Sequence, residues 1–173
     1  MQRSTFVVAA LAVVAAYAGP AAAQESSYTR HKYEACSRAQ SPEPGVIEVR
    51  RCQGKSGIAV LWMSEPDSSS VSFGDKSLDE ALDLGGAAFE VGSTIEWRTG
   101  RRGSTPVAAI VRYRVGAGVS SLNRSVLVVY RLQPSGGSCV MGVVGGADVN
   151  LARRVVDQSA GSFVCGKSAR ARG

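Results

Sequence analysis

The second half of the chain carries four segments that contain β-branched or aromatic residues, separated by short connections that contain glycine. These segments are residues 93–98, 107–115, 125–132 and 138–144. Short glycine-containing connections are typical of β-hairpins, whereas parallel strands need crossovers of about a dozen residues or more. The sequence therefore predicts consecutive antiparallel strands and disfavours a doubly wound parallel fold.

Similar patterns occur earlier in the chain. Strand-like patterns cover residues 46–52, 58–63 and 71–73. The first two flank a turn and indicate a hairpin. The strand pattern then breaks over residues 75–85, where Ser77 and Glu80 have the spacing of a helix capping box. A short helix or turn is expected there.

The clearest helix signal lies near the C-terminus. An apolar stripe with helical spacing begins after Asp148 or Asn150, either of which can cap the helix, and Gly161 can end it. We therefore expect one α+β domain over residues 24–166. It has an antiparallel sheet of about six or seven strands, a C-terminal helix packed on one face, and disulfide cross-links. Residues 167–173 are expected to form a basic flexible tail.

Residues 1–23 have the pattern of a secretory signal peptide. Arg3 precedes an uncharged apolar core at 6–18, and the small residues at 21–23 fit a signal-peptidase site, so cleavage is expected before Gln24. The alternative, a transmembrane anchor, is disfavoured because the apolar run is shorter than the roughly 20 residues that span a bilayer. The expected location is the periplasm or the extracellular medium.

Export decides how the four cysteines are interpreted. In an oxidising compartment, Cys36, Cys52, Cys139 and Cys165 are expected to form two disulfides. Three pairings are possible, and we favour the sequential one, Cys36 with Cys52 and Cys139 with Cys165. A metal site is not expected, because the cysteines lack close spacing and the only histidine, His31, lies outside any ligand pattern. No cofactor is expected.

Charge is distributed unevenly along the chain, whose formal net charge is +6. Residues 65–96 contain eight acidic residues and one lysine, whereas residues 97–173 contain twelve basic residues and two acidic ones. The basic excess is expected to include a site for an anionic partner, such as an envelope polymer, lipid headgroups or an acidic protein. The candidate anion-binding residues are Arg98, Arg101, Arg102, Arg112 and Arg114.

The five candidate arginines form two groups in the sequence. Arg98, Arg101 and Arg102 crowd one turn, while Arg112 and Arg114 share one face of their strand. The alternative is that these arginines solubilise the surface and pair internally with the acidic segment. Nucleic acid is a poor candidate partner, because the chain contains no recognisable nucleic-acid-binding module. The sequence gives no indication of the oligomeric state.

Few residues suggest catalysis. His31 lies in a polar segment, and no nucleophile-elbow, zinc-protease, P-loop or dinucleotide-binding motif occurs. No catalytic residue is therefore nominated, and a non-enzymatic role is favoured. The competing hypothesis is a small cell-wall hydrolase that uses a carboxylate pair, for which Glu90 and Glu96 are the candidates.

Several segments together resemble a group of small exported proteins from Gram-negative bacteria with no assigned activity. They are residues 1–23, 48–52, 95–98, 108–113, 138–140, 150–153 and 162–165. This resemblance implies export and transfers no functional residue. In size, export, β content and paired cysteines, the chain is also loosely similar to periplasmic lysozyme inhibitors. Together these features favour a periplasmic or secreted binding or envelope accessory protein.

Overall fold

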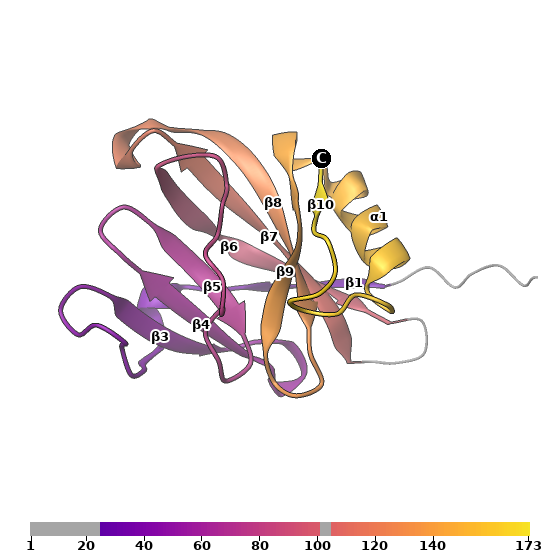
Figure 1. Cartoon of the computed structure of the whole chain (residues 1–173). Helices are drawn as coiled ribbons and strands as arrows, with labels where there is room; N and C mark the ends of the chain where they lie inside the picture. The colour runs from indigo at the N-terminus through magenta and orange to yellow at the C-terminus, as the bar shows by residue number, and fades with distance from the viewer. Residues whose placement is uncertain (1–24, 101–104) are drawn as a thin grey trace, which may run out of the picture.

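The computed structural model describes residues 25–100 and 105–173, which form two β-sheets and one α-helix (Figure 1). The larger sheet contains β1 (Ser26–Arg30), β6 (Ala88–Thr99), β7 (Pro106–Gly116), β8 (Leu122–Leu132), β9 (Ser138–Val144) and β10 (Ala171–Arg172). Its strands lie in the order β1-β6-β7-β8-β9-β10. Neighbours are antiparallel except for β9 and β10, which are parallel.

The smaller sheet is antiparallel and lies in the order β2-β3-β4-β5. Its strands are β2 (Ser37–Arg38), β3 (Glu48–Gln53), β4 (Ala59–Ser64) and β5 (Ser69–Phe73). The helix α1 spans Val149–Ser159. Short 3₁₀ turns occupy Tyr33–Ala35, Lys55–Gly57, Val119–Ser121 and Gly145–Ala147.

The six-stranded sheet is the middle of three layers. Successive side chains of a strand point to opposite faces, so β7 sends Val111 and Tyr113 to one side and Ala108 and Ile110 to the other. On the first side they meet the four-stranded sheet in a core with Val60, Trp62, Val71, Phe73, Trp97 and Tyr130. On the second side the sheet packs against Ala152, Val155 and Val156 of α1. We call the second side the outer face.

The α+β class, with a C-terminal helix on one face of a largely antiparallel sheet, is confirmed. The strand expected at residues 138–144 has the observed bounds of β9. Asp148, rather than Asn150, caps α1, because its Oδ1 accepts a hydrogen bond of 3.0 Å from the Leu151 N–H. The strands do not form one sheet, however. The sequence did not indicate β1, β2 or β10, and residues 46–73 supply three of the four strands of a second sheet.

The helix or turn expected over residues 75–85 is not a helix, and the segment contains bends. Leu78, Leu82 and Leu84 pack against the core between the sheets. Glu80 does not cap a helix. Its Oε1 accepts a hydrogen bond of 2.6 Å from the Val140 N–H of β9. The local capping signal is therefore overridden by a tertiary contact.

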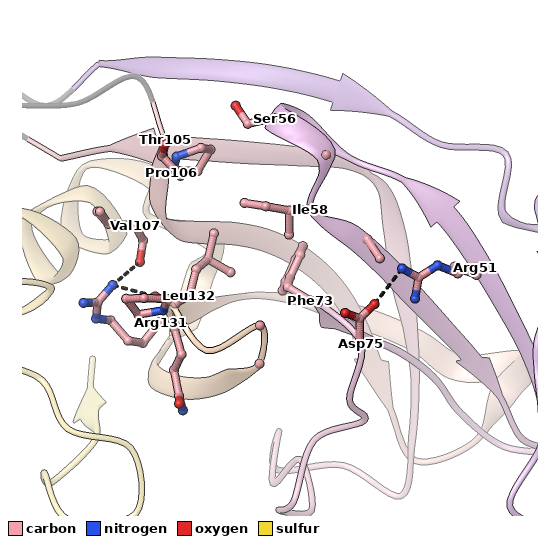
Figure 2. Close-up of a pocket in the computed structure, with 17 residues that line it drawn as sticks. Arg51, Ser56, Ile58, Phe73, Asp75, Thr105, Pro106, Val107, Arg131 and Leu132 are labelled. Atoms are coloured by element: carbon pink, nitrogen blue, oxygen red, sulfur yellow. Dashed lines mark hydrogen bonds and ion pairs between the residues drawn. The ribbon is translucent and has the colours of Figure 1, made fainter.

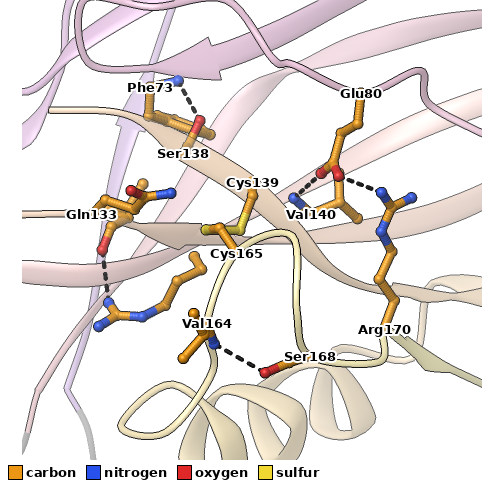
Figure 3. Close-up of a disulfide and its surroundings, with 12 residues drawn as sticks. Phe73, Glu80, Gln133, Ser138, Cys139, Val140, Val164, Cys165, Ser168 and Arg170 are labelled. Carbon is orange, nitrogen blue, oxygen red and sulfur yellow. Dashed lines mark hydrogen bonds and ion pairs between the residues drawn. A yellow bond between two sulfur atoms is a disulfide. The ribbon is translucent and has the colours of Figure 1, made fainter. Parts of the chain in front are cut away.

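The C-terminal residues expected to form a flexible tail are attached to the domain. β10 pairs with β9, and the Gly145 N–H donates to the Gly173 carbonyl at 2.6 Å. Arg170 forms an ion pair with Glu80 (Figure 3), and Arg172 lies 3.5 Å from the Asp83 carboxylate. The basic side chains thus fix the end of the chain against the acidic segment.

The sequential disulfide pairing is confirmed. Cys36 is bonded to Cys52 across a Cα–Cα distance of 5.0 Å, and Cys139 to Cys165 across 5.8 Å. The second bond ties β9 to the segment that follows α1 (Figure 3). Two disulfides are typical of proteins from oxidising compartments. Within residues 25–100 and 105–173, no helix is long and apolar enough to cross a membrane.

Candidate binding face

The outer face of the six-stranded sheet is only partly covered by α1. The helix packs mainly on β8 and β9 and also contacts β7, where Ala108 and Ile110 are buried. It leaves exposed the ends of β6 and β7 that carry Thr94, Arg112 and Arg114. Two arginines of this open region lie opposite the same stretch of β6. Arg30 of β1 pairs with Thr94 of β6, and Arg112 of β7 lies opposite the irregular stretch of β6 between Val91 and Ile95.

Arg30 and Arg112 are both exposed, and no hydrogen bond or ion pair joins either guanidinium to another described residue. One strand separates β1 from β7, so the two backbones are about 10 Å apart at the usual strand spacing. Two unneutralised cations therefore face solvent on one side of the sheet.

Arg153 of α1 reaches the same region from the helix. Its Nε donates to Glu96 Oε1 at 2.8 Å, and its Nη2 donates to Glu96 Oε2 at 3.3 Å and to the Tyr28 hydroxyl at 2.8 Å. Ser26 Oγ adds a hydrogen bond of 2.6 Å to the buried Glu96 carboxylate. The bond to Glu96 raises the pKa of the Arg153 guanidinium. The side chain of Tyr28 remains 55% exposed beside it.

Arg114 completes the group, two residues from Arg112 on the same face of β7. It forms an ion pair with Glu90 of β6, and both side chains are more than half exposed. We refer to Tyr28, Arg30, Arg112, Arg114 and Arg153 as the arginine face. An exposed ion pair of this kind contributes little to stability, so Arg114 can exchange Glu90 for another carboxylate at small cost.

The five arginines predicted from the sequence have different positions. Arg112 and Arg114 are exposed neighbours, as expected from their spacing. Arg98 also points to the outer face, but it is buried, and it donates to Asp157 of α1 and to Ser26, each at 2.6 Å. It holds the helix to the sheet and is not open to a partner. Arg101 and Arg102 lie outside the described residues.

Sequence reasoning missed Tyr28, Arg30 and Arg153. Tyr28 and Arg30 belong to β1, whose polar composition does not give the usual pattern of a strand. A weak signal was present, because Tyr28 and Arg30 alternate with Ser27 and Thr29 in the period of a half-exposed strand. Nothing in the sequence around Arg153 indicates Glu96 as its partner, because the two residues are far apart in the chain.

Half of the eight acidic residues in the segment 65–96 are paired with arginines of the second half of the chain. Four carboxylates of this segment form ion pairs with arginines that follow it: Glu80 with Arg170, Asp83 with Arg172, Glu90 with Arg114, and Glu96 with Arg153. The internal-pairing alternative thus accounts for much of the charge asymmetry. It leaves Arg112 without an acidic partner among the described residues, and Arg30, which precedes the acidic segment, is a second cation of this kind on the outer face.

The candidate catalytic carboxylates are not brought together. Glu90 pairs with Arg114 and Glu96 with Ile110 in the β6–β7 ladder. These partners are four positions apart, which corresponds to about 13 Å along a strand. Glycosidases hold their two carboxylates about 5–5.5 Å or about 6.5–9.5 Å apart. Each of the two acids is also bound to an arginine.

His31 is buried rather than exposed, with 7% of its surface accessible. Its Nε2 lies 2.8 Å from Thr29 Oγ1, and its ring stacks on Tyr33 at 5.7 Å. Burial lowers the pKa of the imidazole. No three His, Cys, Asp or Glu side chains among the described residues gather as a metal site. The position of His31 in the interior is that of a structural residue.

A separate cleft of about 490 Å³ opens at one end of the two sheets (Figure 2). Its apolar walls include Ile58, Phe73, Pro106, Val107 and Leu132. Arg51 at its edge is paired with Asp75 at 2.6 Å. Arg131 donates to the carbonyls of Val107 and Leu132, both at 2.7 Å, and burial lowers the pKa of its guanidinium. Both cations are thus engaged by the protein, and the cleft is a weaker anion site than the arginine face.

Comparison of the chain with protein-family models, with curated proteins and with solved structures finds no match. The functional argument therefore depends on the geometry of the chain itself.

Proposed function

We propose that the protein is a non-enzymatic binding protein of the periplasm or the extracellular medium, and that its arginine face contacts an anionic partner. The observation that carries the proposal is the pair Arg30 and Arg112, exposed on one side of the sheet without an acidic partner among the described residues. The signal-like N-terminus and the two disulfides support the assignment to an exported compartment.

The chemistry of this face suits carboxylate or phosphate groups. A guanidinium presents a planar set of N–H donors that matches either group with two parallel hydrogen bonds. Arginine and tyrosine are also enriched among the residues that dominate binding energy at protein interfaces. Tyr28, exposed and held at its hydroxyl by Arg153, supplies a large contact surface with little freedom to lose.

The test compares two variants of equal net charge. In the first, Arg30→Gln and Arg112→Gln remove the two unpaired cations. In the second, Arg38→Gln and Lys167→Gln remove two exposed cations away from the arginine face. Binding to a fluorescent poly-glutamate is measured by anisotropy at constant ionic strength. We expect the first variant to bind about tenfold more weakly, equivalent to about 1.4 kcal/mol, and the second to bind like the unmodified protein.

Equal weakening in both variants would mean that binding depends on total charge, and the arginine face would not be a site. Circular dichroism of each variant checks that the fold is retained. Substitution of exposed residues normally changes stability by less than about 0.5 kcal/mol.

A further inference from the structure

The strand β1 forms one border of the six-stranded sheet, and one side of its backbone has no strand partner among residues 25–100 and 105–173. The His31 N–H donates to the Ser93 carbonyl at 2.8 Å, and the Thr99 N–H donates to the Glu25 carbonyl at 3.1 Å. In an antiparallel ladder, hydrogen-bonded positions alternate. Ser27 and Thr29 therefore bond to β6. The N–H and C=O groups of Ser26, Tyr28 and Arg30 point away from the sheet.

The other long strand borders are closed by side chains. On β5, the Val71 N–H donates to the Tyr113 hydroxyl at 3.2 Å, and the Phe73 N–H donates to Ser138 Oγ at 2.9 Å. On β9, Glu80 accepts from Val140, and β10 pairs with the far end of the strand.

β2 and β10 are only two residues long. β1 is a border strand of five residues, and no hydrogen bond among the described residues involves the outward backbone groups of Ser26, Tyr28 or Arg30. Proteins usually protect such borders, because they are templates for pairing with another chain.

We propose that β1 receives an extended acidic segment of a partner protein as an additional strand of the sheet. This inference rests on the proposed function and names the partner of the same face. Backbone hydrogen bonds to Ser26, Tyr28 and Arg30 supply affinity, and alternate side chains of the added strand supply specificity. Acidic side chains on the outer face of the added strand lie directly beside Arg30.

Two other arginines of the arginine face lie further from the border than Arg30. Arg153 touches Tyr28, and Arg112 stands two strands behind Arg30, about 10 Å away. An added strand would lie one strand spacing beyond β1, about 14 Å from β7. Because the Debye length is about 10 Å at 0.1 M salt, Arg112 attracts an acidic strand at the border only weakly.

A second copy of this chain is a less suitable occupant. Symmetric pairing of two β1 strands around Tyr28 would place two copies of Arg30 and Arg112 on one continuous outer face. Like charges gathered in this way oppose association. An acidic strand neutralises the same charges, so charge complementarity favours it.

The first experiment uses a capped fluorescent peptide that alternates Thr and Glu, with a Thr and Lys peptide as its matched control. We expect the acidic peptide to bind the unmodified protein and the basic peptide not to bind. We also expect Arg30→Gln to weaken binding about tenfold, more than Arg112→Gln does. Equal binding of the two peptides would overturn the proposal.

The second experiment tests the backbone contact. The acidic peptide is N-methylated either at every Glu or at every Thr, so that donors on only one side of the strand are removed. An added strand uses donors on one side only, and we expect one methylated peptide to lose binding at least tenfold while the other retains it. In the bound protein, the amide hydrogens of Tyr28 and Arg30 should exchange at least tenfold more slowly with solvent.

The outcomes separate the two proposals. If both methylated peptides bind like the parent while the arginine substitutions still weaken binding, the added strand is wrong and the anion-binding function stands. If the arginine substitutions leave peptide and poly-glutamate binding unchanged, the proposed function fails as well.

The Tyr28→Pro substitution removes an outward donor, a position where border strands tolerate proline. Loss of peptide binding with a retained fold is expected. If the unmodified protein instead sediments as a dimer that this substitution dissociates, the occupant is a second copy and the peptide proposal is overturned.

Discussion

Arg98 and Arg112 both point to the outer face, yet their surroundings give them opposite roles. Arg112 is exposed, whereas the side chain of Arg98 is buried between α1 and the sheet and bonded to Asp157. A buried charge that loses its partner is costly, by about 3–5 kcal/mol where the site is fully enclosed. The pairing, more than the residue type, decides whether an arginine stabilises the fold or remains open to a ligand.

The Asp157→Ala substitution tests this difference. It leaves the guanidinium of Arg98 buried without its carboxylate, and because Asp157 itself is 40% exposed we expect a loss of about 2–3 kcal/mol in the free energy of unfolding. The control is Asp79→Ala, which removes an exposed carboxylate without an ion pair among the described residues and should change stability by less than about 0.5 kcal/mol. Urea unfolding measures both. Similar losses in the two variants would contradict the structural role of Arg98.

His31 makes stability depend on pH in a defined direction. Trp97 Nε1 donates to Thr29 Oγ1 at 2.8 Å, so the Thr29 hydroxyl hydrogen is free to donate to a neutral imidazole. Burial lowers the pKa of His31 below its ordinary value of 6.5. The stabilisation from the neutral ring is therefore complete above pH 6.5, and it is lost as the pH falls from 6.5 towards the lower pKa of the folded protein.

The measurement is urea unfolding of the unmodified protein and of His31→Gln between pH 7.5 and pH 5.5. We expect the unmodified protein to lose more stability over this interval than the variant, whose side chain does not titrate. Tyr33, stacked on the imidazole, does not interfere, because burial raises its pKa far above this range. Parallel pH profiles would show that His31 is not the titrating group.

At the scale of strands, the two sheets are joined by side chains that close the border of β5. The Tyr113 hydroxyl accepts from the Val71 N–H and lies 2.6 Å from the Tyr130 hydroxyl. Burial raises the pKa of Tyr113 to about 12, so the phenol stays protonated at neutral pH. Its hydrogen bonds fix the position of the four-stranded sheet over the six-stranded one.

The Tyr113→Phe substitution should therefore weaken the contact between the sheets while keeping the ring in the core. It leaves a buried N–H and a buried hydroxyl without their partner, which costs about 1–3 kcal/mol. Tyr28→Phe removes the same atom from an exposed ring and should cost less than about 0.5 kcal/mol. Chemical denaturation compares the two. A small loss in the Tyr113 variant would mean that packing alone joins the layers.

Elements with strong local patterns were predictable, and elements made by distant contacts were not. β9 and α1 carry their own apolar pattern, so the strand at residues 138–144 and the helix could be identified from the sequence, with Asp148 as one of two candidate caps. β1 is polar and exists because β6 supplies its hydrogen bonds. The segment around Glu80 shows the opposite case. Its local sequence predicts a helix cap, but the Glu80 carboxylate accepts a hydrogen bond from the Val140 N–H instead.

The same division applies to the candidate site. The spacing of Arg112 and Arg114 placed them correctly on one face of a strand. Their neighbour Arg30 could not be found, because the pairing of β1 with β6 joins residues that are far apart in the chain. Arg98 was grouped with the exposed arginines because burial by α1 is also a long-range event.

At the scale of the whole molecule, each disulfide closes a separate part of the three-layer structure. Cys36–Cys52 spans 16 residues and ties the region before β2 to β3, whereas Cys139–Cys165 spans 26 residues and ties β9 to the chain after α1. In the chain-entropy model, each loop contributes about 3 kcal/mol by restricting the unfolded chain. The two loops share no residue, so their contributions should add.

We therefore expect paired alanine substitution of Cys36 and Cys52, or of Cys139 and Cys165, to lower the free energy of unfolding by about 3 kcal/mol, and the quadruple variant to lose about 6 kcal/mol. Domains of this size have a total stability of about 5–15 kcal/mol, so the quadruple variant should be close to unfolding. Urea denaturation of the three variants measures the sum. A quadruple variant no less stable than either pair would contradict the additivity of the two loops.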